Sequence, residues 1–149
     1  IPLRLVGSEM CIRDRYGATS PIQKNWYLSG DTMMKDKEGY YFFVGRSDDI
    51  ITSSGYRIGP FDVESALIEH QAVTEAAVIG KPDPERTEIV KAFIVLQKGF
   101  SASDSLIVEL QNYVRKRLSA HAFPREVSFI DELPKTPSGK VQRFLLRGK

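Results

Sequence analysis

Three short stretches of the sequence concentrate residue types that could carry out chemistry. The first, "NWYLSGD", ends in Asp31 after Gly30, a glycine that allows a tight turn and leaves the carboxylate exposed. An exposed carboxylate can accept hydrogen bonds from two neighbouring hydroxyl groups, as in a ribose diol. An ordinary surface turn explains the same residues, so both interpretations stay open at this point.

The second stretch, "GRSDDIITSSGYRIGPFDVE", combines charged residues with glycines at short intervals. Glycines at this spacing indicate a backbone that turns sharply or lets a ligand approach closely. A charged loop before a helix is the alternative, because acidic residues near a helix N-terminus are favourable there. The residues concerned are Arg46, Asp48, Asp49, Arg57, Asp62 and Glu64, with Gly45, Gly55 and Gly59.

The third stretch, "LPKTPSGKVQR", places Lys140 after Ser138 and Gly139. It is not a phosphate-binding P-loop, because Pro134 occupies the first glycine position and Val141 replaces the Ser or Thr. A loop that presents one ammonium group suits a reaction in which negative charge develops on phosphate or carboxylate oxygens. A solvated basic tail is the alternative interpretation.

Two structural pieces must position these stretches. Between residues 16 and 47, "MMKDKEGYYF" predicts two strands joined by a turn at Gly39, and "GYYFFVG" is the clearest strand. One hairpin cannot bury a core by itself, so this piece is predicted to be the edge of something larger. From Asp48 onward the pattern predicts a self-sufficient α+β domain.

The α+β domain is predicted to contain strands and amphipathic helices. "VTEAAVIG" and "IVKAFIVLQKG" read as strands separated by the turn "KPDPERTE", and "REVSFIDELP" reads as a further strand. "GKVQRFLLRGK" predicts a short basic helix. Two helices are predicted within "PFDVESALIEH" and "SASDSLIVELQNYVRKRLSAH", with apolar faces formed by Phe61, Val63, Leu67 and Ile68, and by Leu106, Leu110, Val114 and Leu118.

Composition argues against several classes of function. The formal net charge of +2 is too small to argue for a nucleic-acid partner. No apolar run reaches the roughly 18 residues of a membrane span. Neither His70 nor His121 lies in a metal-ligand pattern, so both are expected on the surface or in packing. At 149 residues the chain can hold one complete domain with part of another.

Residues 5–15, "LVGSEMCIRDR", match neither the composition nor the periodicity of the rest of the chain. They contain Cys11, the single cysteine, beside two arginines that could lower a thiol pKa. The peptide also resembles the translation of a transposase adapter used in sequencing libraries. We therefore expect residues 1–15 to be an unpacked assembly artefact and exclude them from reasoning about the fold.

In this order and spacing, the three stretches resemble the late core motifs of the adenylate-forming enzymes. This family contains acyl-CoA synthetases, adenylation domains of peptide synthetases and luciferases. The resemblance covers residues 16–149, and "SGYRIGPFDVESALIEH" is similar to the medium-chain acyl-CoA synthetase branch. It implies an α+β fold in which residues 48–149 are the small, mobile C-terminal domain of the family. Residues 16–47 would be the β-rich C-terminal edge of the large AMP-binding domain.

The resemblance also implies the reaction of an AMP-forming acid–thiol ligase. A carboxylic acid attacks the α-phosphate of ATP to give an acyl-adenylate and pyrophosphate. The small domain then rotates, and the CoA thiol displaces AMP. ATP and CoA are thus expected as substrates, with Mg²⁺ accompanying ATP on ligands outside this sequence. The glycine-rich phosphate loop and the acyl pocket are absent as well, so the fragment alone is expected to be inactive.

Matching positions imply individual roles in the first half-reaction and in the rotation. Residues like Asp31 and Arg46 hold the ribose hydroxyls, and Arg57 matches a basic residue that contacts the nucleotide. Lys140 matches the lysine that bridges carboxylate and phosphate oxygens during adenylation only. The position of Asp48 matches the hinge, which absorbs the backbone change of domain rotation.

For the thioester step, Ser54, Gly55 and Tyr56 match the loop that lies along the pantetheine arm of CoA. Arg86 and Arg115 match positions that can meet the CoA phosphates, a contact that suits the guanidinium fork. Solvated surface charge is the alternative interpretation for both arginines.

Two other functions stay open from the sequence. The first is an adenylation domain that serves a carrier protein, which would share Lys140 and the hinge. The second is a stand-alone module that binds CoA or a partner without catalysis, although such a module has no reason to carry the ribose-binding "YLSGD" edge. The synthetase interpretation implies a role in fatty acid metabolism and a cytoplasmic or organelle-matrix location, without a nucleic-acid or membrane partner.

Overall fold

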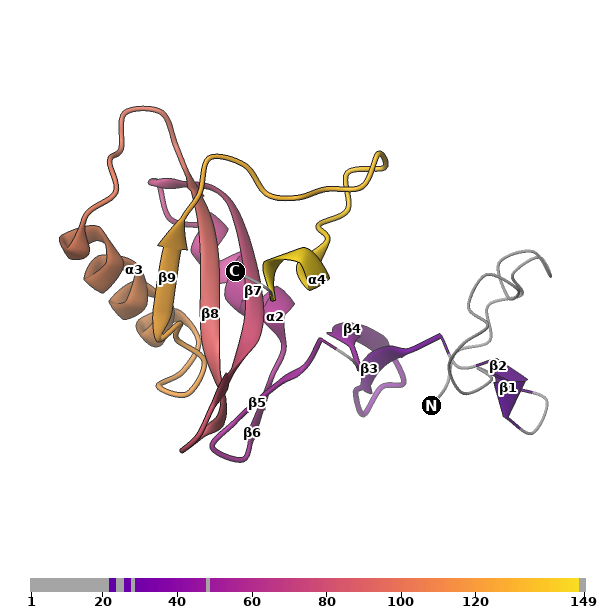
Figure 1. The fold of residues 1–149 in the computed structure, drawn as a ribbon. Coiled ribbons are helices and arrows are strands. Elements are labelled where there is room, and N and C mark those ends of the chain that lie inside the picture. Colours follow the sequence, from indigo (N-terminus) through magenta and orange to yellow (C-terminus); the bar gives the residue numbers. More distant parts are fainter. Residues whose placement is uncertain (1–21, 24–25, 28, 48, 148–149) are drawn as a thin grey trace. The chain divides into compact units, whose positions relative to one another are not determined.

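The computed structural model describes residues 22–23, 26–27, 29–47 and 49–147 (Figure 1). The chain divides into two compact units, Ile1–Asp48 and Asp49–Lys149. The expectations for residues 1–15, including Cys11, and for Asp48 fall outside the described residues.

The described residues of the first unit form two antiparallel strand pairs. β1 (Ile22–Gln23) pairs with β2 (Trp26–Tyr27), and β3 (Asp31–Lys35) pairs with β4 (Tyr41–Arg46). The predicted turn between β3 and β4 is confirmed. The Asp36 carboxylate accepts hydrogen bonds from the backbone amides of Glu38 and Tyr40, both at 2.9 Å, and Gly39 has a φ of +98°. Large side chains of this hairpin stay exposed in the described structure: Met34, Tyr40, Tyr41, Phe42 and Phe43.

The second unit is built on a five-stranded sheet. Its order is β6 (Tyr56–Ile58), β5 (Ile51–Ser53), β8 (Thr87–Leu96) and β7 (Val73–Asp83), with β9 (Glu126–Phe129) parallel to β8. β7 and β8 form a long antiparallel hairpin. Both strands extend into the predicted turn, because the Asp83 carboxylate accepts hydrogen bonds from the Glu85 and Arg86 amides and closes a turn of only residues 84–86. At its other end β8 stops at Leu96, three residues before the predicted end of that strand.

Helices cover one face of this sheet. α2 (Pro60–Ile68) and α3 (Asp104–Arg117) pack there, and α3 begins where the Ser103 hydroxyl accepts a hydrogen bond from the Leu106 amide. The opposite face holds α4 (Arg143–Leu146) and the segment before it (Figure 1). Successive residues of a strand point to opposite faces. Accordingly, Ala76 and Val78 join the core under α2 and α3, whereas Ala77, Ile79, Phe93, Leu133 and Leu146 form the smaller core under α4.

Three apolar residues predicted on helix faces are exposed instead. Phe61 and Ile68 are 52% and 50% exposed, because the buried face of α2 is centred on Val63 and Leu67, one to two residues away around the helix. Leu118 is 40% exposed because α3 ends at Arg117 and the backbone leaves the helical conformation at Leu118. The expectations for Val63, Leu67, Leu106, Leu110 and Val114 are confirmed.

Candidate functional site

Asp31 and Arg46 are direct neighbours across the β3–β4 ladder. The Gly30 carbonyl accepts a 2.7 Å hydrogen bond from the Ser47 amide, which closes the open end of the hairpin beside them. Gly30 has a φ of +79°, and a Cβ atom there would lie 3.2 Å from the Arg46 guanidinium. A glycine therefore lets the exposed Asp31 carboxylate and the Arg46 side chain occupy one edge of the hairpin. Such an edge can offer an acceptor and a donor to a diol.

Ser54 and Gly55 form the two-residue turn between β5 and β6. Their φ angles are +50° and +84°, a pair of positive values that matches the tight hairpin turns favoured by strand twist. The Ser54 amide donates to the Arg86 carbonyl at 2.9 Å, and the Arg86 guanidinium donates to the Ser54 hydroxyl at 2.9 Å. A Cβ on Gly55 would meet no atom within 4 Å. The turn is thus held by Arg86 while its Gly55 face stays open.

Tyr56 connects this turn to the loop after α3. Its ring stacks on the His121 ring with centroids 3.7 Å apart and an angle of 13° between the planes. Two residues further on, the buried Phe123 ring lies under the Arg115 guanidinium at 4.2 Å and the Arg125 guanidinium at 5.1 Å. From the sequence, His121 is expected only on the surface or in packing, and because it follows Tyr56 by 65 positions no local pattern indicates the stack.

Arg57 is exposed on β6 opposite Thr52. Four residues predicted to contact CoA lie together in one cluster around the β5–β6 turn: Ser54, Gly55, Tyr56 and Arg86. Sequence analysis did not predict β5 and β6 as strands, because three-residue strands inside a glycine-bearing charged stretch give too short an apolar pattern.

Lys140 lies in a tight loop between Leu133 and α4. Lys135 and Val141 pair as an isolated bridge, and the backbone of Thr136 and Lys140 closes the loop with a 2.8 Å hydrogen bond. Gly139 has a φ of +84°, and the Lys140 amide donates to the Thr136 hydroxyl at 3.1 Å. The Lys140 side chain is exposed, and its ammonium makes no ion pair with the residues that the structure describes. The loop thus presents to solvent a cation that no described carboxylate neutralises.

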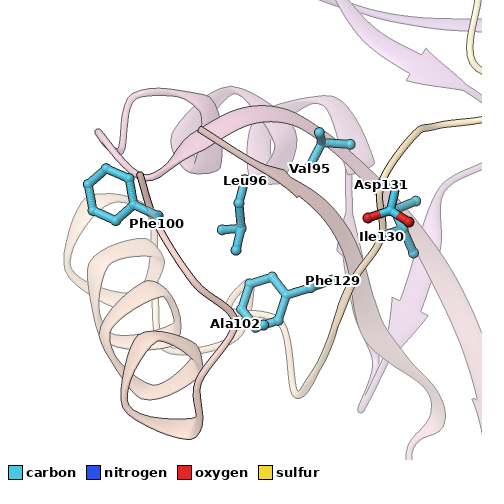
Figure 2. Close-up of a pocket in the computed structure, with 7 residues that line it drawn as sticks. All are labelled: Val95, Leu96, Phe100, Ala102, Phe129, Ile130 and Asp131. Atoms are coloured by element: carbon cyan, nitrogen blue, oxygen red, sulfur yellow. The ribbon is translucent and has the colours of Figure 1, made fainter. Parts of the chain in front are cut away.

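A groove of about 440 Å³ lies elsewhere on the second unit (Figure 2). No residue singled out from the sequence lines it, so it does not contribute to the candidate site. Its lining residues are Val95, Leu96, Phe100, Ala102, Phe129, Ile130 and Asp131.

Two further features are absent from the described residues. No three His, Cys, Asp or Glu side chains there gather closely enough to hold a metal ion. No helix in that part of the chain is long and apolar enough to cross a membrane.

Sequence comparisons relate this chain to one family of enzymes. The family described as "AMP-binding enzyme C-terminal domain" matches residues 62–140. Acetyl-coenzyme A synthetase of Bacillus subtilis (strain 168) is 57% identical over 122 residues, which cover 82% of this chain and 21% of that protein. Mitochondrial acyl-coenzyme A synthetase ACSM4 of Rattus norvegicus is 55% identical over 128 residues, covering 85% of this chain and 22% of the relative.

Solved structures give the same result. The crystal structure of Brucella canis acyl-CoA synthetase matches with a TM-score of 0.68 and 59% identity, over 89% of this chain and 24% of that one. The anthranilate CoA ligase AuaEII in complex with anthranoyl-AMP matches with a TM-score of 0.76 and 44% identity, over 85% and 24% of the two chains. The chain therefore spans about a fifth to a quarter of the length of these relatives.

Proposed function

We propose that this chain, which belongs to the family of AMP-binding enzyme C-terminal domains, is the C-terminal part of an ATP-dependent acyl-CoA synthetase. The observation that carries this proposal is the 57% identity to an acetyl-coenzyme A synthetase over 122 residues, which cover 82% of this chain. The complete enzyme would join a carboxylic acid to ATP as an acyl-adenylate and then transfer the acyl group to the thiol of CoA.

In the adenylation step, Asp31 and Arg46 would bind the ribose hydroxyls of ATP. Their adjacency across the β3–β4 ladder supports this role, because one acceptor and one donor then face the same diol. Arg57 would contact the nucleotide. Lys140 would bridge the carboxylate and phosphate oxygens, where an ammonium stabilises the negative charge that develops as the new bond forms. Its exposed position on a closed loop supports this role.

In the thioester step, the Ser54–Gly55 turn would lie along the pantetheine arm of CoA. The open space around Gly55 supports this role, because a chain without side-chain obstruction can pass close to the backbone. Tyr56 would line the same path, and Arg86 and Arg115 would meet the phosphates of CoA. Both guanidinium groups are already oriented by contacts, Arg86 by the Ser54 hydroxyl and Arg115 by the Phe123 ring.

Each step needs its own face of the small domain, so Asp48 would serve as the hinge between the two arrangements. A Mg²⁺ ion that accompanies ATP would supply charge neutralisation at the phosphates, with ligands from outside this sequence. The role in fatty acid metabolism and the cytoplasmic or organelle-matrix location are also proposals. Relatives named mitochondrial support a matrix location.

The relatives favour a CoA synthetase over the two alternatives. Relatives with more than half of their aligned residues identical to this chain include several that are named acetyl- or acyl-coenzyme A synthetases. A carrier-protein partner and a non-catalytic module find no support among these names.

A chimera tests the proposal. Residues 16–149 would replace the corresponding C-terminal segment of the Bacillus subtilis acetyl-coenzyme A synthetase, whose identity of 57% makes a compatible junction plausible. We expect ATP-dependent and acetate-dependent release of pyrophosphate, followed by CoA-dependent formation of acetyl-CoA. The truncated relative without any replacement segment is the control. A folded chimera with no more activity than that control would contradict the proposal.

A further inference from the structure

Glu64 and Arg143 form a partly buried ion pair that joins the two faces of the sheet. The Arg143 guanidinium donates to Glu64 Oε1 at 2.8 and 3.2 Å and to Oε2 at 2.8 Å. The two side chains are 11% and 25% exposed. Glu64 belongs to α2 on one face, and Arg143 opens α4 on the other. The pair therefore bridges elements that are separated by 79 positions in the sequence.

The bridge passes around the free edge of β7. Within the described residues β7 pairs only with β8, and the Val78 amide donates to Glu64 Oε1 at 2.9 Å instead of to another strand. One carboxylate thus satisfies an edge amide and holds the guanidinium. Burial raises the pKa of Glu64 above its ordinary value, and the hydrogen bond and charge of Arg143 act in the opposite direction. Without Arg143, Glu64 would be a desolvated carboxylate lacking its counter-ion.

Asp49 extends the ion pair to the start of the second unit. Its carboxylate lies 3.6 Å from Arg143 Nη1 and 2.8 Å from Arg147 Nη2. We call Asp49, Glu64, Arg143 and Arg147 the clasp. Asp49 directly follows the proposed hinge residue, Asp48, and Arg143 stands three residues after Lys140. The clasp therefore connects the hinge side of the unit with the lysine loop.

α4 depends on such anchoring because it has only four residues, far fewer than an isolated helix needs. Figure 1 shows α4 beside β7, and the two elements are in contact. Leu146 is fully buried on the smaller core. The other end of the lysine loop is fixed as well, since Lys135 Nζ lies 2.6 Å from Glu75 Oε1 on β7. The lysine loop is thus held near the edge strand β7 at both of its ends.

We propose that Glu64 and Arg143 are positioning residues, which fix the Lys140 loop relative to the hinge end of the domain through the clasp. This proposal rests on the proposed adenylation role of Lys140. A preorganised cation is effective only when it is held in place, and a displacement of about 1 Å can slow a reaction by about 10²-fold. Glu64 and Arg143 would not touch substrate themselves, because both act through the position of Lys140.

The first test measures the loop itself in the 149-residue chain. Endoproteinase Lys-C cleaves only after lysine, so substitutions of arginine do not alter its sites. We expect Arg143→Gln and Glu64→Gln to raise the initial rate of cleavage between Lys140 and Val141 by about tenfold, because cleavage follows the population of the opened loop. Arg117→Gln breaks the exposed pair with Glu69 and is the matched control, with an unchanged rate.

Circular dichroism and thermal unfolding establish that each variant is folded. Arg143→Lys is the second variant, because it keeps the charge while removing the two-pronged hydrogen bonding, and we expect an intermediate cleavage rate. A Lys140–Val141 cleavage rate that Arg143→Gln leaves at the wild-type value would overturn the clasp.

The second test measures the two half-reactions in the chimera. We expect Arg143→Gln and Glu64→Gln each to slow adenylation by about 10–10²-fold while acetyl transfer from supplied acetyl-adenylate stays within about twofold. The double variant should be no slower than the worse single variant, because residues that act as one unit are not additive.

The results separate this inference from the proposed function. If Lys140→Ala slows adenylation but both clasp variants leave it unchanged, the positioning role is wrong. If Lys140→Ala itself has no effect, the proposed role of the lysine fails, and the clasp is judged on the cleavage rates alone.

Discussion

A substitution of Gly55 is expected to affect CoA binding far more than it affects the stability of the fold. In Gly55→Leu, the new side chain would enter space in which no atom lies within 4 Å, so no steric clash with the protein is expected. The φ of +84° still penalises a leucine, by about 1–2 kcal/mol for a left-handed conformation. If the pantetheine arm of CoA passes over this turn, the same side chain obstructs its path.

Gly99 is a matched control for this substitution. It has a φ of +96° and equally open surroundings, but it lies in the turn after β8 and carries no proposed role. Gly55→Leu and Gly99→Leu should therefore lower the free energy of unfolding of the 149-residue chain by similar amounts, measured by urea denaturation.

In the chimera, the two variants should differ. We expect Gly55→Leu to slow acetyl transfer to CoA by about 10²-fold or more, the scale expected when reacting groups are displaced by about 1 Å. Its adenylation rate should stay close to wild type, and Gly99→Leu should leave both steps unchanged. Equal slowing of both half-reactions by Gly55→Leu, or equal effects of the two leucines on acetyl transfer, would show that the pantetheine arm does not pass over this turn.

Three further predictions follow from the fold and the proposed hinge. Glu126→Gln should destabilise the 149-residue chain by about 1–3 kcal/mol at pH 7, because it removes the counter-ion of Lys91, which is only 7% exposed. The loss should be smaller than for a fully buried pair, since Glu126 itself is one-third exposed. Hydrogen bonds from Lys81 and then Lys91 lower the pKa of Glu126 below 4.5. The stability that it contributes is therefore complete above pH 4.5 and lost as the pH falls through the folded-state pKa, so urea denaturation should show wild type and variant converging in acid; a difference in stability that does not shrink as the pH is lowered would contradict this. Leu110→Ala should cost about 2–5 kcal/mol at a fully buried position, whereas Val108→Ala, 54% exposed on the same helix, should change stability by less than about 0.5 kcal/mol. Asp48→Pro in the chimera should preserve one half-reaction and abolish the complete cycle, because proline fixes φ near −65°; equal loss of both steps in a folded variant would argue against a hinge.

Local patterns in the sequence predicted local structure well. The Gly39 turn depends on neighbouring residues, and the buried face at Leu106, Leu110 and Val114 depends on apolar residues repeated every four positions. The errors at Phe61, Ile68 and Leu118 also have a local cause. Apolar composition alone does not determine which side of a short helix meets the sheet, nor the residue at which the helix ends.

Long-range contacts could not be predicted from such patterns. The Tyr56–His121 stack and the Glu64–Arg143 pair join segments 65 and 79 positions apart, and their geometry depends on how the sheet brings those segments together. Arg143 is the last residue of "LPKTPSGKVQR", one of the three stretches predicted to carry out chemistry. Its role stayed hidden because its partner, Glu64, reads as an ordinary acidic residue near a helix N-terminus.

The role of Lys140 in adenylation alone is tested by the effect of Lys140→Ala on the two half-reactions of the chimera. Pre-steady-state measurements should show adenylation slowed by about 10²–10³-fold, the loss expected for one preorganised electrostatic group. Acetyl transfer from supplied acetyl-adenylate to CoA should stay near the wild-type rate. Lys98→Ala, which removes another exposed lysine, should leave both rates unchanged. Equal slowing of both steps by Lys140→Ala, or no slowing of either, would contradict the account.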